Sequence, residues 1–188
     1  MKKGFSLIEM LVVMAVFMTM MLVVSDIFLS VTISQRKSMV MQKSMVDLQY
    51  NMEQIAQQIR LSQIDYSAYH LPINELQDEL HLINSQNQKV AFGTETVGCA
   101  LGIETCLIQS IDDQRSIISA DNFDIQSLSF RIAPNEDPLE FDNITKQYKS
   151  DKQPQITIYL KALPVAVHEE DQKPLALQTT ISSRYYAR

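Results

Sequence analysis

The stretch Phe5–Val24, FSLIEMLVVMAVFMTMMLVV, is apolar all round except at Ser6, Glu9 and Thr19. An α-helix rises about 1.5 Å per residue, so about 20 residues cover the roughly 30 Å hydrocarbon core of a bilayer. The stretch therefore has the length and composition of a membrane-spanning helix. Its one carboxylate, at Glu9, is the exception that needs a separate explanation.

Lys2 and Lys3 precede this apolar stretch, and the positive-inside bias predicts a cytoplasmic N-terminus with the rest of the chain outside the cytoplasm. A cleaved secretory signal peptide also combines a positive start with an apolar run. Its cleavage site should follow the run, but the sequence there, Val24–Leu29 (VSDIFL), has no A-x-A pattern. The sequence therefore favours a retained membrane anchor over a removed signal peptide.

The segment Lys2–Leu11, KKGFSLIEML, resembles the class III signal of type IV prepilins and type II secretion pseudopilins. In that family a membrane peptidase cuts between the glycine and the phenylalanine and then methylates the new terminal amine. The resemblance implies cleavage between Gly4 and Phe5 and N-methylation of Phe5. Glycine suits such a site, because a residue without Cβ lets a protease approach the backbone closely.

Glu9 is the most informative residue of the apolar stretch, because a carboxylate inside a membrane helix costs roughly 2.5 to 3.5 kcal/mol. After cleavage no Lys or Arg lies within one helical turn of it, whereas the new amine of Phe5 is positively charged. The resemblance implies that Glu9 pairs with the terminal amine of a neighbouring subunit and sets the stagger between protomers. The alternative from the residues alone is that Glu9 reaches the cytoplasmic interface.

One long helix is predicted from Phe5 to Leu71, because this range contains no Gly and no Pro, and Pro72 marks a point beyond its end. Beyond the membrane its apolar residues recur at spacings of four and three and form one stripe. The stripe consists of Met41, Met45, Leu48, Met52, Ile55 and Ile59. Packing against the protein's own sheet is the favoured use of this stripe, and a coiled-coil dimer is the alternative.

After Pro72 the apolar period changes toward two, which is typical of half-buried strands. The predicted strands are His81–Ile83, Lys89–Phe92, Cys106–Ser110, Ile125–Ile132, Gln155–Leu163 and Leu175–Ser183. Residues Ala133–Pro154 are too polar and acidic to form core and are predicted to be a loop. A helix followed by strands predicts an α+β fold with an antiparallel sheet on the second half of the helix, as in pilins.

The expected organisation has four parts. Residues 1–4 form the cleaved leader, 5–31 the transmembrane or filament-core helix, 32–71 its amphipathic continuation, and 72–188 an extracytoplasmic β-rich domain. Cys99 and Cys106 are the only two cysteines, and outside the cytoplasm disulfides persist, so a bridge between them is predicted. A metal site is the weaker alternative, because no His lies near the pair.

Other chemistry finds little support in the sequence. His70, His81 and His168 are scattered and predicted to be surface residues. The acidic groups Asp112–Asp113, Asp121 with Asp124, and His168–Asp171 do not follow an EF-hand spacing and are interpreted as solvated loop charge rather than a calcium site. No catalytic residue, metal site or cofactor is predicted, and the net charge of −6 gives no basic field for nucleic acid.

These features predict a structural subunit of a type IV filament system rather than an enzyme: a minor pilin, or alternatively a minor pseudopilin of type II secretion. Residues 48–60 and 177–184 look like the helix end and last strand of larger minor pilins and J-type minor pseudopilins. The family's frequent proline within the span is missing. The resemblance implies four partners: prepilin peptidase, other pilins, an inner-membrane platform protein, and the inner membrane itself before assembly into an extracytoplasmic filament. A signal-anchored enzyme or binding protein is the remaining alternative.

Overall fold

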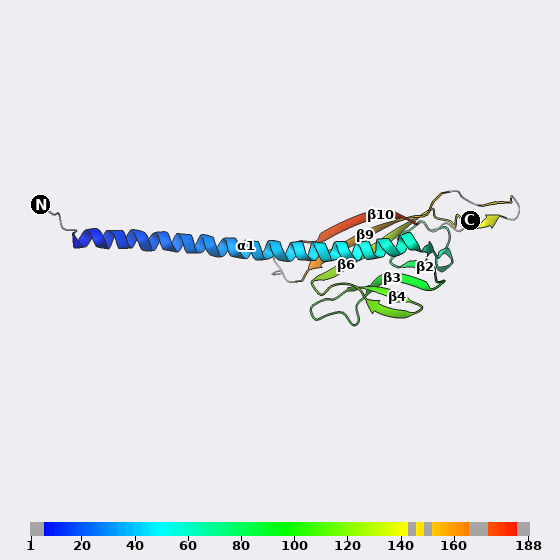
Figure 1. Ribbon diagram of the computed structural model, residues 1–188, viewed down its shortest axis with the longest axis horizontal. Coiled ribbons are helices and arrows are strands. Elements are labelled where there is room, and N and C mark those ends of the chain that lie inside the picture. Colours follow the sequence, from blue (N-terminus) through cyan, green and yellow to red (C-terminus); the bar gives the residue numbers. More distant parts are fainter. Residues whose placement is uncertain (1–5, 143–145, 149–151, 166–172, 184–188) are drawn as a thin grey trace. The chain divides into compact units, whose positions relative to one another are not determined.

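The computed structural model describes residues 6–142, 146–148, 152–165 and 173–183. The chain divides into two compact units, residues 1–42 and residues 43–188. The helix α1 (Leu7–Leu61) begins in the first unit and ends in the second (Figure 1). The predicted single helix without a break is confirmed as far as Leu61.

The helix ends ten residues earlier than the predicted Leu71. Gln63 and Ile64 form the short strand β1 (Gln63–Ile64), which pairs with Ile83 and Leu82. Burial of Ile64, which is 2% exposed, stabilises this turn of the chain away from the helix axis. The helix boundary is therefore set by a long-range strand pairing. No Gly or Pro near Leu61 marks this boundary in the sequence.

Besides the end of α1, the described part of the second unit contains two antiparallel sheets, a hairpin and a short 3-10 helix. The larger sheet has the order β1-β2-β3-β4-β5, with β2 (Leu80–Ile83), β3 (Lys89–Glu95), β4 (Cys106–Ile111) and β5 (Gln114–Ile117). The smaller sheet has the order β10-β9-β6, with β6 (Phe123–Ala133), β9 (Gln155–Pro164) and β10 (Leu175–Ser182). The hairpin joins β7 (Phe141–Asp142) to β8 (Gln147–Tyr148), and a short 3-10 helix η1 (Tyr66–Ala68) follows β1.

All six predicted strands are present, with ends shifted by up to three residues. The sequence did not predict β1, β5, β7 or β8. All four residues of β5 are exposed, so this strand lacks the apolar alternation that identifies a half-buried strand. The β7–β8 hairpin lies inside the range that was predicted to be a loop, and an edge-to-face contact of Phe141 with Tyr148 accompanies it.

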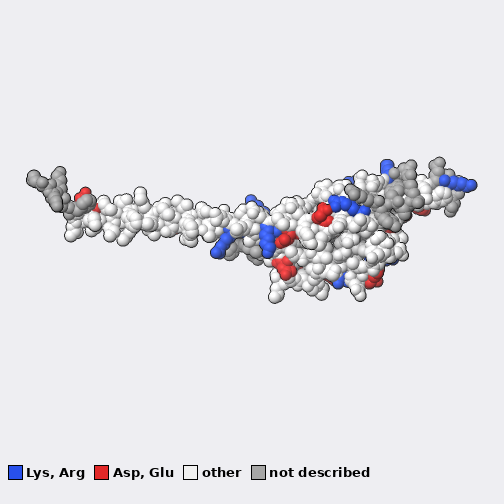
Figure 2. Space-filling model, in the orientation of Figure 1, with Lys and Arg blue, Asp and Glu red and all other residues white. Residues whose placement is uncertain are grey.

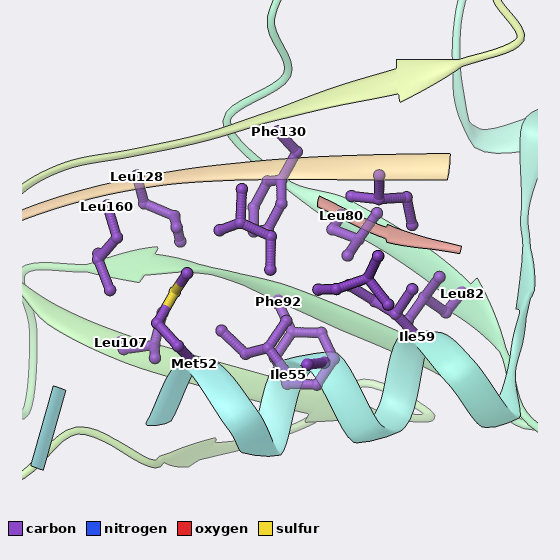
Figure 3. Close-up of a cluster of buried hydrophobic side chains, with 14 of the residues drawn as sticks. Met52, Ile55, Ile59, Leu80, Leu82, Phe92, Leu107, Leu128, Phe130 and Leu160 are labelled. Carbon is purple, nitrogen blue, oxygen red and sulfur yellow. The ribbon is translucent and has the colours of Figure 1, made fainter. Parts of the chain in front are cut away.

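The core of the second unit forms where the C-terminal part of α1 meets both sheets (Figure 3). Leu48, Ile55 and Ile59 are fully buried and Met52 is 6% exposed, whereas Met45 of the predicted stripe is only half-buried. Burial of each such side chain stabilises the fold by about 1.5–3 kcal/mol. The stripe thus packs on the protein's own sheets, and the α+β fold class is confirmed.

Polar side chains also enter this helix–sheet interface, which the apolar stripe did not predict. Ser44 is fully buried and donates its hydroxyl to the carbonyl of Asn122 at 3.2 Å. Asn122 in turn donates its amide to the Asp47 carboxylate at 2.6 Å. These bonds join the first turns of α1 within the second unit to the segment that precedes β6.

Candidate functional site

The N-terminal turn of α1 holds the candidate assembly site. The carbonyl of Ser6 accepts the first helical bonds, from the backbone N–H groups of Glu9 (3.0 Å) and Met10 (3.3 Å). The helix therefore starts within two residues of the predicted cleavage junction. Gly4 and Phe5 themselves lie outside the described residues.

Glu9 lies exposed in this first turn. A helix N-terminus carries a partial positive charge, which stabilises a nearby carboxylate by about 0.3 to 1 kcal/mol. This gain is smaller than the roughly 2.5 to 3.5 kcal/mol that a membrane-embedded carboxylate costs. The partial charge of the helix N-terminus thus offsets only part of the free-energy cost of placing the Glu9 carboxylate in a membrane.

An apolar surface surrounds the first half of α1 on every side. All of the large hydrophobic residues from Leu7 to Val24 are exposed, and Figure 2 shows few charged side chains along this part of the helix. Among the described residues, α1 is the one helix whose length and composition would allow it to cross a membrane. Such a surface is unfavourable in water and suited to hydrocarbon or to neighbouring helices.

Hydroxyl groups on this helix bond back to its own carbonyls. Thr19 donates to the carbonyl of Val16, and Ser25 donates to that of Met21, both at 2.8 Å. A buried hydroxyl without a partner costs free energy in an apolar environment, and these bonds remove that cost. Glu9 therefore remains as the charged group of the apolar stretch, and no partner for it is found among the described residues.

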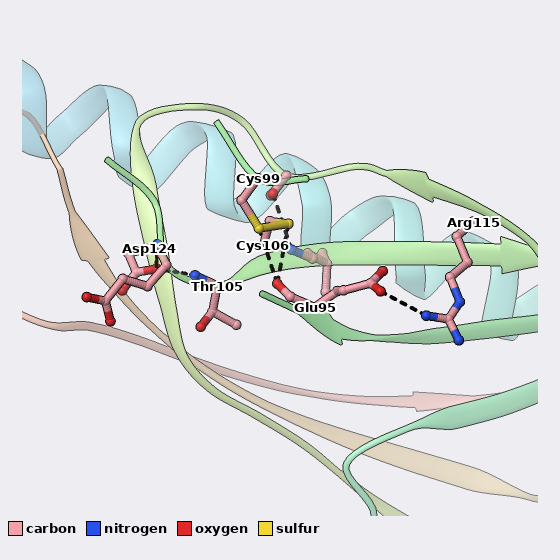
Figure 4. The surroundings of a disulfide bond; sticks show 9 residues. Glu95, Cys99, Thr105, Cys106, Arg115 and Asp124 are labelled. Atoms are coloured by element: carbon pink, nitrogen blue, oxygen red, sulfur yellow. Dashed lines mark hydrogen bonds and ion pairs between the residues drawn. A yellow bond between two sulfur atoms is a disulfide. The ribbon is translucent and has the colours of Figure 1, made fainter. Parts of the chain in front are cut away.

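A second feature is the disulfide between Cys99 and Cys106, whose Cα atoms lie 5.7 Å apart. The bridge closes the loop between β3 and β4 (Figure 4). Both sulfur atoms contact the carbonyl oxygen of Glu95, at 3.2 and 3.4 Å. The predicted pairing of the two cysteines is present in the structure.

Asp124 also holds this loop. One of its carboxylate oxygens accepts the backbone N–H groups of Glu104 (3.0 Å) and Thr105 (2.8 Å). Asp112 has a similar task and accepts the N–H of Lys89 at 3.0 Å. Asp112 is exposed, in keeping with the interpretation as solvated loop charge, but both aspartates also accept backbone N–H groups some twenty residues away and so help to order the loops.

The described histidines and acidic residues do not combine into a metal site. In the parts of the chain that the structure describes, no group of three or more His, Cys, Asp or Glu is placed to hold a metal ion. His70 is exposed, whereas His81 is half-buried, with its ring 5.5 Å from that of Tyr69 and its Nε2 3.5 Å from Glu79. The segment His168–Asp171 lies outside the described residues.

Residues 1–25 match the family model described as the prokaryotic N-terminal methylation motif. A search of curated proteins and a search of solved structures found no match to the chain. The motif supports a prepilin-type signal of the kind found in type IV pilins and pseudopilins. It implies processing by prepilin peptidase and assembly with other pilins, and it points to a structural subunit rather than an enzyme. The apolar helix that follows is consistent with membrane anchoring.

Proposed function

We propose that this chain is a minor pilin or minor pseudopilin, a structural subunit of a type IV filament system. The observation that carries the proposal is the methylation motif at residues 1–25, which leads directly into an exposed apolar helix. A signal that is removed after the apolar run would discard this surface. Cleavage before the run keeps it, so that it can serve first as an anchor and then as a contact between subunits.

In this proposal the peptidase removes residues 1–4, and residues 5–31 anchor the subunit as a single pass in the inner membrane before they enter the filament core. Residues 32–71, helical as far as Leu61, continue from the anchor, and residues 72–188 form the extracytoplasmic domain. An inner-membrane platform protein and other pilins are the assembly partners. The assembly ATPase acts through the platform.

The proposed task of Glu9 follows from its energetics. The helix N-terminus offsets at most about 1 kcal/mol of a cost of roughly 2.5 to 3.5 kcal/mol. A positively charged amine on Phe5 of a neighbouring subunit would supply the remainder, and the attraction is strongest where water is excluded. Such pairing would also fix the axial stagger between neighbouring subunits.

Processing is tested by the intact mass of the protein from its native host. We expect a chain that begins at N-methylated Phe5 and lacks Met1 to Gly4. As a control, Gly4→Leu should block cleavage, because the added side chain hinders approach of the peptidase to the backbone. A wild-type chain that still starts at Met1 would indicate an uncleaved anchor, and a start after about residue 25 would indicate an ordinary signal peptide.

Assembly is tested by the distribution of variants between the membrane and sheared filaments. Glu9→Leu should insert at least as well as wild type, because it removes a carboxylate from the span, yet it should be lost from filaments. Glu9→Asp, with a shorter reach, should show a partial loss. Asp26→Leu removes the next carboxylate of α1, beyond the apolar stretch, and should assemble normally. Normal recovery of Glu9→Leu in filaments would refute the assigned role.

A further inference from the structure

A hollow of about 850 Å³ opens on the outer face of the three-stranded sheet. Its walls are Ile73–Leu76, the end of β6 with the turn after it (131–135), Lys152, Gln153, Gln155 and Tyr159. Its volume falls within the range of about 300–1,000 Å³ that is usual for ligand sites. All of these residues belong to the second unit.

Hydrogen bonds tie the walls of the hollow together. The backbone N–H of Ile73 donates to the carbonyl of Asn135 at 2.9 Å, and the Asn135 amide reaches Asn74 at 3.4 Å. Gln77 and Phe130 exchange two further backbone bonds, of 2.9 and 2.7 Å. The hollow is thus largely preformed, which lowers the ordering cost of binding a ligand.

Three side chains that face this hollow have no hydrogen-bond partner among the described residues: those of Arg131, Gln155 and Tyr159. In the strand register Arg131 pairs with Thr157, so Gln155 and Tyr159 are its two diagonal neighbours on the same face of the sheet. Diagonal neighbours lie roughly 7–8 Å apart, within reach of long side chains. The sheet therefore presents a guanidinium, an amide and a phenol ring together.

The chemistry of this set fits a sugar. Amide groups donate and accept hydrogen bonds, as sugar hydroxyls do, and an aromatic ring packs against the C–H face of a pyranose. Amide side chains of Asn74, Asn135, Gln153 and Gln155 line the hollow. Asn135 and Gln153 already donate one bond each, to Asn74 and to the carbonyl of Ser183, whereas the Gln155 amide has no partner among the described residues. A phosphate dianion fits less well, because it has no proton to donate to the amide oxygens.

The charge of the residues that line the hollow further restricts the class of sugar that would bind. Arg131 brings a fixed positive charge to the hollow, and its guanidinium has no ion-pair partner among the described residues. An Arg guanidinium binds a carboxylate through two parallel hydrogen bonds. We propose that this hollow binds an acidic saccharide of the uronic-acid class, with the carboxylate on Arg131, a sugar ring on Tyr159 and hydroxyls on the amides.

A second hollow, of about 310 Å³, differs from the first in the interactions of its polar side chains. Several of its polar side chains already have partners: Glu79 lies 3.5 Å from His81, Asp65 accepts the hydroxyl of Ser67, and Arg115 pairs with Glu95 at 2.9 Å. These groups are occupied in holding the fold, whereas Arg131, Gln155 and Tyr159 are not. The larger hollow is therefore the better candidate for a ligand, and it does not depend on the filament function proposed above.

The test uses the full chain in detergent and the binding of trigalacturonate, with maltotriose as the neutral probe. Arg131→Gln should weaken trigalacturonate binding about tenfold or more, as expected for a charge-assisted pair. Tyr159→Ala should weaken the binding of both sugars. Lys161→Gln is the matched control, because it removes one positive charge from the same face of the sheet, on β9 and outside the hollow, and it should change affinity less than about twofold.

Circular dichroism shows whether each variant keeps the wild-type fold. If Arg131→Gln does not fold, Arg131→Lys tests the same contact. Lys keeps the charge but loses the two-bonded geometry, so it should bind with intermediate affinity. Absence of trigalacturonate binding by wild type would overturn the proposal. So would equal affinity for maltotriose, or an equal loss in Lys161→Gln and Arg131→Gln.

Discussion

Removal of the disulfide by Cys99→Ala isolates the contribution of the bridge to stability. The substitution leaves the sulfur of Cys106, which is 1% exposed, in its packed position. The two cysteines lie seven positions apart in sequence, and the loop-closure estimate for such a ring is about 2 to 3 kcal/mol. We expect the free energy of unfolding to fall by this amount.

The loop should keep its folded conformation without the bridge. Two backbone bonds to Asp124 hold it, and Cys106 remains paired with Glu95 in the β3–β4 ladder. The loss of stability would thus come from the unfolded chain, which gains freedom when the ring is open. At roughly 2–4 °C per kcal/mol, the melting temperature should fall by about 4–12 °C.

The measurement is thermal and urea unfolding of the full chain in detergent. Wild type under reducing conditions should match Cys99→Ala, because both lack the bridge. Thr96→Ala, which alters an exposed residue beside the ring, should unfold as wild type does. A loss below about 0.5 kcal/mol in Cys99→Ala would refute the loop-closure argument.

Two further predictions concern the interior of the second unit. The amide nitrogen of Asn51 is buried without a partner among the described residues, so Asn51→Leu should raise the free energy of unfolding by about 1 kcal/mol in denaturant titrations, whereas Asn51→Asp should lower it. Burial raises the pKa of Tyr69 to about 12, above its usual 10, and the nearby carboxylates of Asp65 and Glu79 add to this. The unfolded state therefore ionises first, and the stability that Tyr69 contributes is present below pH 10 and lost between pH 10 and 12. Tyr69→Phe should be less stable at pH 8, because the N–H of His81 loses its acceptor, and should show a flatter fall above pH 10.

Local patterns in the sequence predicted the elements that depend on local signals. The apolar run after Phe5 and the alternation of Ile156, Ile158 and Leu160 identify a helix and a buried strand without reference to other parts of the chain. These residues are helical or fully buried as expected. The four-and-three spacing of Leu48, Met52, Ile55 and Ile59 likewise predicted the face of α1 that meets the sheets.

Features that depend on distant partners could not be predicted in this way. The helix ends at Leu61 because Gln63 pairs with Ile83, and nothing between these residues signals that pairing. From the sequence alone, Asp124 is interpreted as a surface charge, because only the folded chain brings its carboxylate to the backbone N–H of Thr105. The hollow proposed to bind a saccharide likewise combines segments near residues 73, 131 and 155, which the pairing of β6 with β9 and the backbone bond from Ile73 to Asn135 bring together.

The continuity of α1 from Leu7 to Leu61 has a mechanical consequence. A pull on the apolar stretch is transmitted along one uninterrupted ladder of backbone hydrogen bonds to Leu48, Ile55 and Ile59, the side chains at the centre of the folded core. The load therefore reaches the β-domain through its interior rather than through a surface linker. Resistance to such a load is governed by the unfolding rate of that core. A force that extracts the apolar stretch from a bilayer would thus act directly on this buried core, where detachment requires the helix to leave both sheets.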